Sequence, residues 1–381
     1  MILPGATLGL VGGGQLGRMF CMAARNMDYQ VTVLDPDPLS PAAEFATGHL
    51  NTAYTHPVSL DELAKTCAAV TTEFENAPSE TLIALATKTT VRPSGHAVAI
   101  AQDRSAEKGF FQRNAFPVGP FAVVQNTEDI ISAVRSIPFP AVLKTARFGY
   151  DGKGQSRINS AEQLAAIFAE WKGVTCVLEQ FLPLKMEISV ILARAEDGET
   201  AVFPVVENLH VNGILEISIA PARISAHLAA QARDIATQVA IALEYVGVLA
   251  VEFFVLADDT LLINEIAPRP HNSGHYTIDA CRSTQFEQQV RVLCGLPLGD
   301  ATQHSPAVML NLLGDLWQGA NYDISPDWSV LLEHAGAHLH LYGKRVARKG
   351  RKMGHVTVCD TSVEAALAAV MGMKATLGGT R

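Results

Sequence analysis

Two apolar runs joined by an Asp-Asp pair, VLAVEFFVLADDTLLINEI at 248–266, constrain the fold of this chain more than any other segment. Paired aspartates between apolar runs are typical of a tight turn, so the segment is predicted to form a β-hairpin. If Ala257 pairs with Thr260, Glu252 stands directly opposite Glu265 on the neighbouring strand. The sequence therefore predicts two carboxylates that face each other across a strand pair.

The same register places Phe254 opposite Ile263 and Leu256 opposite Leu261, so the glutamates are expected at the end of a buried apolar face. Carboxylates about 5 Å apart repel each other unless something neutralises them. A divalent cation would do so, and Mg²⁺ prefers a few carboxylates together with phosphate oxygens. Two alternatives stay open here: a lysine or arginine pairs with one glutamate, or the hairpin register differs by one residue.

The first hundred residues alternate short apolar runs with helical patterns, which predicts a parallel α/β sheet. Between a strand predicted at 7–11 and a helix predicted at 16–27 lies Gly-Gly-Gly-Gln-Leu-Gly (12–17), which satisfies G-x-G-x-x-G, and Asp35 ends the next strand. Such a loop turns helix N-terminal amides toward an anion, but it does not specify the anion. Dinucleotide binding, a bare strand–helix turn and another phosphate ligand all stay open.

A second glycine-rich segment follows the strand AVLKT (141–145), in which Lys144 is the one cation of an apolar run. This segment, GYDGKGQ at 149–155, alternates glycines with polar residues, and it is predicted to be a mobile hairpin whose amides close over phosphates. It does not match G-x-x-x-x-G-K-[ST], so it is not a P-loop. An ordinary glycine-rich hairpin tip is the alternative.

Length and composition bound the function. The 381 residues suffice for about two or three domains, and the patterns divide the chain at 1–101, 102–298 and 299–381. A net charge of −9 argues against nucleic acid as a partner, and no apolar run approaches the roughly 20 residues of a membrane span. Six cysteines without a CxxC pair favour a reducing cytosol. KRVARKGRK at 344–352 has six cations in nine residues, which is more often a solvated loop than an anion site.

Lys144, the glycine segment and the carboxylate hairpin together resemble the ATP-grasp superfamily, in which two β-rich subdomains hold a nucleotide. The resemblance implies Mg²⁺ bound by Glu252 and Glu265. It assigns contacts with ATP to Arg104, Lys144, Gly149, Tyr150, Asp151, Gly152, Lys153, Gly154, Gln155, Glu179, Gln180, Phe181, Leu182, Glu187, His210, Asn264 and Glu265. The chain departs from the common pattern at Ala267, where many members have an asparagine that binds a second ion.

Longer strings extend the resemblance in order along nearly the whole chain: GGGQLGRM (12–19), TTEFENAP (71–78), GYDGKGQ (149–155), NEIAPRPHNSGHYTIDAC (264–281) and GRKMGH (350–355). These strings are similar to those of the N5-carboxyaminoimidazole ribonucleotide synthetases. The resemblance implies a fold of the α/β and α+β classes. An ATP-grasp domain with a glycine-rich lid would follow a Rossmann-like parallel α/β domain and precede a small mixed β domain.

Similarity to that family implies an ATP-dependent ligase of purine biosynthesis. It would convert 5-aminoimidazole ribonucleotide, bicarbonate and ATP, through carboxyphosphate, into N5-carboxyaminoimidazole ribonucleotide, ADP and phosphate, as a cytoplasmic homodimer. The resemblance assigns contacts with the ribonucleotide to Gln15, Leu16, Glu73, Asn76, Lys344 and Arg351. Arg269 would bind carboxyphosphate, since a guanidinium can bind it bidentately, Asp151 would take the amine proton, and His271 would orient the intermediate.

Three other functions compete with this interpretation. A formate-using ATP-grasp enzyme, such as the glycinamide ribonucleotide transformylase, shares the ATP-binding residues and would respond to formate. A Rossmann oxidoreductase would bind NADH and ignore ATP. A regulator that only binds ATP fits less well, because Glu252, Glu265, Lys144 and Arg269 are all retained.

Overall fold

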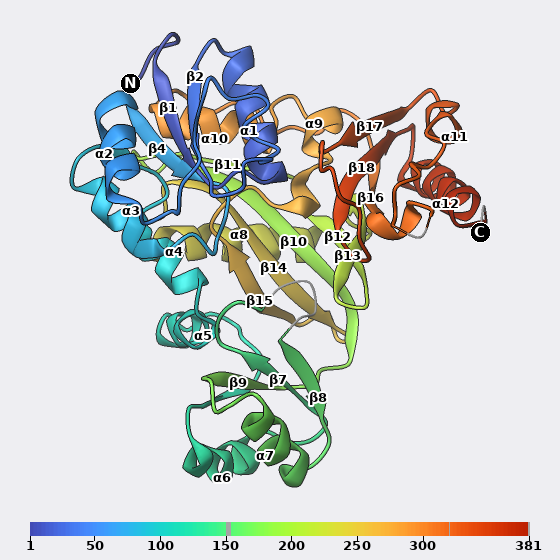
Figure 1. Ribbon diagram of the computed structural model, residues 1–381. Helices are drawn as coiled ribbons and strands as arrows, with labels where there is room; N and C mark the ends of the chain where they lie inside the picture. The colour runs from blue at the N-terminus through green and yellow to red at the C-terminus, as the bar shows by residue number, and fades with distance from the viewer. Residues whose placement is uncertain (150–153, 320, 380–381) are drawn as a thin grey trace.

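The computed structural model describes residues 1–149, 154–319 and 321–379, whose strands form three sheets (Figure 1). The N-terminal strands form a parallel five-stranded sheet, the next strands an antiparallel four-stranded sheet, and the others an antiparallel nine-stranded sheet. The fold is therefore α/β at its N-terminus and α+β beyond it, as predicted. Within the described ranges, each helix is too short or too polar to cross a membrane.

The five-stranded sheet has the strand order β3-β2-β1-β4-β5. Its region comprises β1 (Thr7–Val11), α1 (Gln15–Asn26), β2 (Gln30–Leu34), β3 (Gly48–Leu50), α2 (Pro57–Thr66), β4 (Ala69–Thr72), α3 (Ser79–Ala86), β5 (Thr90–Val91) and α4 (Gly95–Ala101). Leu8 and Leu10 pack with Phe20 of α1 on one face, whereas Val11 packs with Leu63 of α2 on the other. Because helices cover both faces, the central strands are largely buried on both sides, as in other parallel sheets.

The four-stranded sheet has the order β6-β9-β7-β8 and one covered face. Its region comprises α5 (Arg104–Arg113), β6 (Phe121–Val124), α6 (Thr127–Ser136), β7 (Ala141–Thr145), β8 (Gln155–Ile158), α7 (Ala161–Glu170) and β9 (Cys176–Gln180). Ala141 and Leu143 of β7 pack in the core that this sheet forms with α6 and α7. Val142 and Lys144 alternate with them and therefore point to the other face, which lines a cleft.

The nine-stranded sheet joins the other regions and has the order β15-β14-β10-β12-β13-β16-β18-β17, with β11 paired to β10. Its first half comprises β10 (Leu184–Arg194), β11 (Thr200–Val202), β12 (Val206–Val211), β13 (Ile214–Ala220), α8 (Ala226–Ala242), β14 (Gly247–Leu256), β15 (Leu261–Ala267), η1 (Asn272–Gly274), α9 (Thr277–Ala280) and α10 (Gln285–Cys294). Val251 and Phe253 of β14 pack against Ala236 of α8 and its neighbours, which closes one face of this half. The opposite face is apolar at Ala250 and its buried neighbours, and polar at Glu252, which lines the cleft.

The C-terminal strands continue this sheet, because β16 pairs with β13 in an antiparallel register. The elements are β16 (Ala307–Leu313), η2 (Gly314–Leu316), α11 (Ser329–Leu332), β17 (Ala337–Leu341), β18 (Lys352–Cys359) and α12 (Val363–Gly379). α12 packs on these strands through Val370 and Met373. One hydrogen-bonded sheet thus links the carboxylate hairpin to the C-terminal region (Figure 1).

Candidate active site

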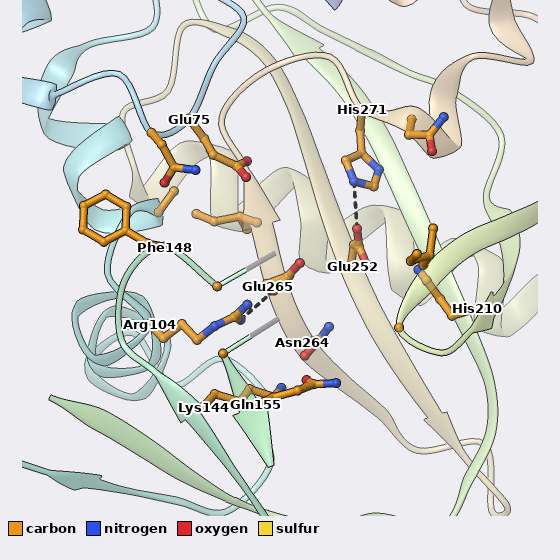
Figure 2. Close-up of a pocket in the computed structure, with 18 of the residues that line it drawn as sticks. Glu75, Arg104, Lys144, Phe148, Gln155, His210, Glu252, Asn264, Glu265 and His271 are labelled. Atoms are coloured by element: carbon orange, nitrogen blue, oxygen red, sulfur yellow. Dashed lines mark hydrogen bonds and ion pairs between the residues drawn. The ribbon is translucent and has the colours of Figure 1, made fainter. Parts of the chain in front are cut away.

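The predicted site residues converge on one cleft with a volume of about 930 Å³ (Figure 2). It is lined by all the described residues predicted to be functional: Gln15, Leu16, Glu73, Asn76, Arg104, Lys144, Gly149, Gly154, Gln155, Glu179, Gln180, Phe181, Leu182, Glu187, His210, Glu252, Asn264, Glu265, Arg269, His271, Lys344 and Arg351. The other four, Tyr150, Asp151, Gly152 and Lys153, lie outside the described residues. Side chains from three separate sequence regions therefore share a single cavity.

Glu252 on β14 stands directly opposite Glu265 on β15, as predicted. The two carboxylates have different partners: Glu252 Oε1 lies 3.0 Å from His271 Nε2, and Glu265 Oε2 accepts a 2.6 Å hydrogen bond from Arg104 Nη1. Burial raises the pKa of Glu265, but the Arg104 guanidinium outweighs burial and the net shift is downward. Glu265 is therefore a carboxylate at neutral pH, and an arginine pairs with it, as one of the alternatives held.

The predicted register between the turn and the glutamates was wrong by one residue. Ile263 pairs with Phe253 in place of Phe254, Leu261 with Val255 in place of Leu256, and Thr260 with Leu256 in place of Ala257. A β-bulge between the pairs Glu252–Glu265 and Phe253–Ile263 makes Asn264 an extra residue and restores the opposition of the glutamates. The glutamates consequently share their face with Phe254, which lines the cleft, and not with the buried face of Phe253.

The bulge residue Asn264 gives a test of whether these residues suit a cation. Its side-chain Oδ1 is buried and has no hydrogen-bond partner among the described residues. A buried oxygen without a partner, beside two carboxylates, has the ligand chemistry of a hard cation. The residues present therefore fit Mg²⁺, although Ala267 adds no ligand of its own.

Lys144 and Glu179 form an ion pair beneath this hairpin. Lys144 Nζ donates a 3.0 Å hydrogen bond to Glu179 Oε2, and Lys108 Nζ lies 3.7 Å from the same oxygen. Burial raises the pKa of Glu179, but Lys144 and Lys108 lower it by more. The second oxygen, Glu179 Oε1, is buried and has no partner among the described residues, so it is an acceptor that a ligand in the cleft could use.

Two neighbouring charges were missed from the sequence. Lys108 is only 2% exposed and donates to the backbone oxygen of Asn264, while Glu107 accepts from the amide of Ile266. Burial, followed by the charge of Glu265, raises the pKa of Glu107. The signal was a pair of adjacent opposite charges, Glu107 and Lys108, which cannot both be buried without partners. α5 is thus attached to β15 through polar groups.

Glu187 and His210 lie on adjacent strands of the nine-stranded sheet. His210 Nδ1 is 3.2 Å from Glu187 Oε2, without hydrogen-bond alignment. Burial lowers the pKa of His210, but Glu187 raises it by more, so the net shift is upward. The two side chains form an ion pair when His210 is protonated.

Arg269 follows β15 and forms an ion pair with Glu75 from the N-terminal region. It also donates a 3.0 Å hydrogen bond to the Pro270 carbonyl. Glu75 stands in the string TTEFENAP but was not predicted to be a site residue. A carboxylate that occupies Arg269 identifies this guanidinium as a group suited to a small carboxylate or phosphate.

The backbone amides of the glycine loop after β1 donate hydrogen bonds to carboxylates of the protein itself. Gly13 N donates to Asp35 Oδ2 at 2.7 Å, and Gly14 N and Gly17 N donate to the two oxygens of Glu73 at 2.7 and 3.2 Å. These are the amides that would receive a pyrophosphate in a dinucleotide-binding fold. Glu73 therefore holds the loop as well as lining the cleft, and the dinucleotide alternative loses its anion site.

The basic stretch 344–352 is not merely a solvated loop. Five of its six cations line the cleft: Lys344, Arg348, Lys349, Arg351 and Lys352. Lys344 Nζ contacts Gln15 Oε1 and donates to the Lys352 carbonyl at 2.6 Å. Burial and the charge of Arg348 lower the pKa of Arg351, so both disfavour its cationic form. A bound anion would offset the repulsion from Arg348 and favour that form.

Gly314 explains how the backbone of this stretch is fixed. A Cβ atom at Gly314 would lie 2.3 Å from the carbonyl oxygen of Arg348 and 2.6 Å from its amide nitrogen. Gly314 N also donates to the Arg351 carbonyl at 2.8 Å, and Gly350 N donates to Asp315 Oδ2 at 2.6 Å. Only glycine allows the two backbones to approach this closely.

Comparisons with known proteins agree with this geometry. Residues 5–102 match the ribonucleotide synthetase preATP-grasp domain, residues 109–286 the ATP-grasp domain, and residues 307–369 the phosphoribosylaminoimidazole carboxylase C-terminal domain. The chain is 45% identical to the N5-carboxyaminoimidazole ribonucleotide synthase of Brucella melitensis, over 93% of this chain and 96% of that protein.

Two solved structures have the same fold throughout. An N5-carboxyaminoimidazole ribonucleotide synthetase in complex with ADP superposes with a TM-score of 0.91 and 41% identity, covering 98% of this chain and 97% of that one. The Aspergillus clavatus synthase in complex with ADP and 5-aminoimidazole ribonucleotide has a TM-score of 0.89 and 30% identity, covering 98% of both chains.

The three sheets and the cleft between them therefore define an ATP-grasp enzyme. The identity and coverage go further. The chain belongs to the N5-carboxyaminoimidazole ribonucleotide synthase family.

Proposed function

We propose that this ATP-dependent ligase carboxylates the exocyclic amine of 5-aminoimidazole ribonucleotide with bicarbonate, in the synthesis of purines. A bicarbonate oxygen attacks the γ-phosphorus of ATP, the bond to ADP breaks, and carboxyphosphate forms. Carboxyphosphate then loses phosphate to give CO₂, and the amine nitrogen attacks that carbon and releases a proton. The products are N5-carboxyaminoimidazole ribonucleotide, ADP and phosphate.

One observation carries the proposal: two groups of side chains suited to phosphates line the same cleft. One group is Lys144 and Arg104 with the carboxylate hairpin that would hold Mg²⁺, and the other is the basic stretch 344–352. A reaction between a nucleoside triphosphate and a ribonucleotide phosphate requires both groups. Phosphoryl transfer needs positioning and charge stabilisation more than a protein nucleophile, which suits this set of residues.

We assign the nucleotide to the cavity between the four-stranded and nine-stranded sheets. Lys144 would bind a phosphate, and the carbonyl and amide groups of 179–182 would bind adenine, with Glu179 Oε1 as a further acceptor. Glu187, supported by His210, would accept hydrogen bonds from the ribose hydroxyls. Gly149, Gly154 and Gln155, which belong to the second glycine-rich segment, also line the cleft.

Glu252, Glu265 and Asn264 would hold Mg²⁺ with the nucleotide. When bound, this ion would neutralise charge on the phosphates as the γ-phosphoryl group is transferred. Arg104 keeps Glu265 ionised, and His271 holds one oxygen of Glu252. The hairpin thereby presents two oriented carboxylates before any ligand arrives.

Arg269 would bind bicarbonate and then carboxyphosphate. For this to happen its ion pair with Glu75 must open, and a carboxylate-for-carboxylate exchange costs less than exposing a bare guanidinium. His271 would help to orient the intermediate through the carboxylate of Glu252 that it holds, and we retain Asp151 as the proposed base for the amine proton. The ribonucleotide would lie across Gln15, Leu16, Glu73 and Asn76, with its phosphate on Lys344 and Arg351.

Steady-state release of ADP tests the function. With Mg²⁺, ATP, bicarbonate and 5-aminoimidazole ribonucleotide we expect ADP in a one-to-one ratio with the carboxylated ribonucleotide. Omitting the ribonucleotide should abolish most ADP release, and formate should not replace bicarbonate. Stimulation by formate would instead favour a formate-using ligase of the same fold.

We further propose that the enzyme is a cytoplasmic homodimer with regions divided at 1–101, 102–298 and 299–381. The six cysteines are free thiols, which suits a reducing compartment. Light scattering during size-exclusion chromatography tests the oligomeric state: a mass near the 40.7 kDa of one chain would rule out the dimer.

A further inference from the structure

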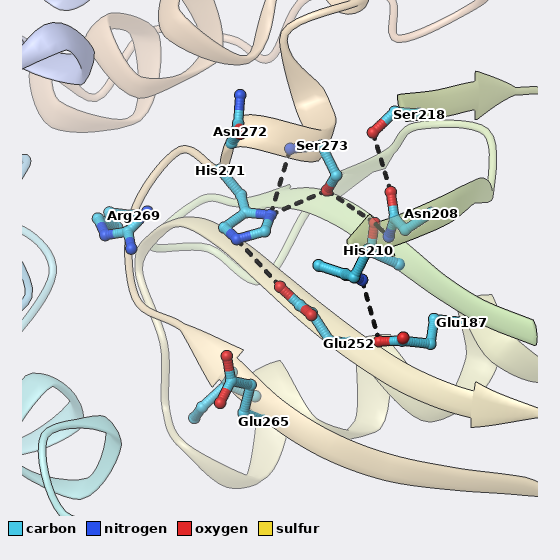
Figure 3. Close-up of polar contacts among 12 residues, drawn as sticks. Glu187, Asn208, His210, Ser218, Glu252, Glu265, Arg269, His271, Asn272 and Ser273 are labelled. Carbon is cyan, nitrogen blue, oxygen red and sulfur yellow. Dashed lines mark hydrogen bonds and ion pairs between the residues drawn. The ribbon is translucent and has the colours of Figure 1, made fainter. Parts of the chain in front are cut away.

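A buried chain of hydrogen bonds leads from the middle of the nine-stranded sheet to His271 (Figure 3). Ser218 Oγ on β13 bonds to Asn208 Oδ1 on β12 at 2.9 Å, and Asn208 Nδ2 bonds to Ser189 Oγ on β10 at 3.0 Å. Ser189 Oγ lies 2.7 Å from Ser273 Oγ in η1, which lies 2.9 Å from His271 Nδ1. Apart from His271, the four residues of this chain of hydrogen bonds, Ser218, Asn208, Ser189 and Ser273, are at most 5% exposed. We call these four residues the relay.

The strand register explains why these side chains meet. Ser189 stands opposite Glu252 across β10 and β14, and Asn208 stands opposite Ser218 across β12 and β13. Paired residues point to the same face, so this face of the sheet carries a polar row that ends at the cleft. The alternate residues, such as Ile188, enter the apolar core.

The amide end of the relay fixes the direction in which protons are donated. Asn208 Nδ2 can only donate, and its acceptor is Ser189 Oγ. The Ser189 hydroxyl is therefore free to give its own proton to Ser273 Oγ. Ser273 in turn gives its proton to His271 Nδ1.

The histidine end is consistent with the same direction. The backbone N–H of Ser273 also points at His271 Nδ1, at 3.4 Å, where the imidazole caps η1. A peptide N–H cannot accept a proton, so this contact also favours a lone pair on Nδ1, although it is weaker than the 2.9 Å contact with the Ser273 hydroxyl. Neutral His271 then carries its proton on Nε2, 3.0 Å from Glu252 Oε1.

We propose that Ser218, Asn208, Ser189 and Ser273 are positioning residues that hold His271 as its Nε2–H tautomer. In that form His271 donates a hydrogen bond to Glu252 and orients this carboxylate in the cleft. The kinetic consequence rests on the proposed function, whereas the tautomer does not. Outer partners that orient a ligand-binding carboxylate typically contribute about 10–100-fold to activity or affinity.

Nitrogen-15 NMR of the full chain with labelled histidine tests the tautomer directly. We expect a protonated Nε2 and an unprotonated Nδ1 for His271, identified by the resonances that disappear in His271→Asn. Asn208→Asp keeps the shape but turns the donor into an acceptor, so Ser189 turns toward position 208 and the relay loses its direction. A proton should then appear on Nδ1, and kcat should fall about 10–100-fold. KM for the ribonucleotide should stay within about twofold, because Lys344 and Arg351 are untouched.

Asn311→Asp is the matched control. Asn311 is 3% exposed on β16 of the same sheet and bonds to Asn272 and the Leu215 carbonyl, outside the relay. The Asn311→Asp variant introduces a buried carboxylate as Asn208→Asp does, so it should lower the stability of the protein without changing the His271 tautomer. If Asn208→Asp fails to fold, Ser273→Ala replaces it, because it removes the hydroxyl donor and leaves only the weaker backbone contact at Nδ1, so part of the His271 population should carry its proton on Nδ1.

Two results would overturn the relay. One is a protonated Nδ1 in the wild-type protein, and the other is an unchanged tautomer in the folded relay variants. A wild-type protein that forms no ADP would instead overturn the proposed function and leave the tautomer result intact. The two failures are therefore distinguishable.

Discussion

Arg104 opens α5 and donates a 2.6 Å hydrogen bond to Glu265 on β15, so the hairpin and the helix before the four-stranded sheet share one ion pair. The side chains of Arg104 and Glu265 are 19% and 35% exposed. Glu265 therefore keeps its charge while part of it stays open to the cleft. This relationship makes Glu265 the more informative of the two glutamates to mutate.

Glu265→Gln keeps the shape of the side chain and removes its charge. Electrostatic groups of this kind contribute about 3 kcal/mol to the transition state, so kcat should fall roughly 10²-fold or more. Steady-state ADP release measures the change, and KM for the ribonucleotide should move little. Asp259→Asn, which removes an exposed charge from the turn of the same hairpin, is the control. Equal losses in both variants would contradict the role of Glu265.

Arg351→Ala should raise KM for the ribonucleotide. Loss of one charge-assisted contact costs about 1.5–3 kcal/mol, equivalent to about 10–150-fold, while KM for ATP should change little. Some loss of kcat is expected, because remote binding energy also orients the amine. Arg345→Ala is the matched control, since Arg345 is the one cation of 344–352 that does not line the cleft. An increase in KM for ATP alone would mean that this stretch does not bind the ribonucleotide phosphate.

Glu75→Gln should lower KM for bicarbonate. Glu75 competes for Arg269, and both side chains are partly exposed, at 29% and 15%, so the pair is worth about 1 kcal/mol after solvent screening. Its removal should lower KM about fivefold. ADP release in CO₂-depleted buffer with added bicarbonate measures this. A higher KM would show that Glu75 holds Arg269 in its productive position.

The ion pair of Glu187 with His210 predicts a pH dependence. The pKa of His210 lies above its ordinary 6.5, because Glu187 and Glu252 outweigh burial and the charge of Lys352. A raised folded-state pKa stabilises the fold fully below about pH 6.5, and this contribution is lost as pH rises through the folded pKa. Glu187→Gln should therefore reduce stability more at about pH 6 than at about pH 9. Urea unfolding at both values checks this, and an equal loss would mean that His210 is not charged.

Local patterns predicted most of the elements near the site. The strands at 7–11, 69–72 and 141–145 form where the apolar runs are, because burial against helices determines them locally. The union of β13 with β16 was not predicted. It joins residues about ninety positions apart, and no local pattern encodes such a pairing.

In the site, too, local patterns predicted some features, and contacts between distant segments were missed. The opposition of Glu252 and Glu265 was predicted for a partly wrong reason, since a shifted turn and the bulge at Asn264 cancel. A bulge depends on how a strand fits its neighbours in the sheet, and pairing residues by counting outward from the turn does not take this into account. Lys108 and Glu75 were missed because each derives its role from a partner, Glu179 or Arg269, on a distant segment.

The pairing of β13 with β16 also concerns solubility. A chain that ended at residue 298 would leave the seven residues of β13 as an open strand edge. Ile217 and Ile219 on that edge are buried against the C-terminal strands and α12 in the intact chain. Open apolar edges recruit strands from other molecules, so the shortened chain should aggregate even though every predicted contact with ATP precedes residue 298. By pairing with β13, the C-terminal region would thus prevent self-association of the sheet that lines the ATP site.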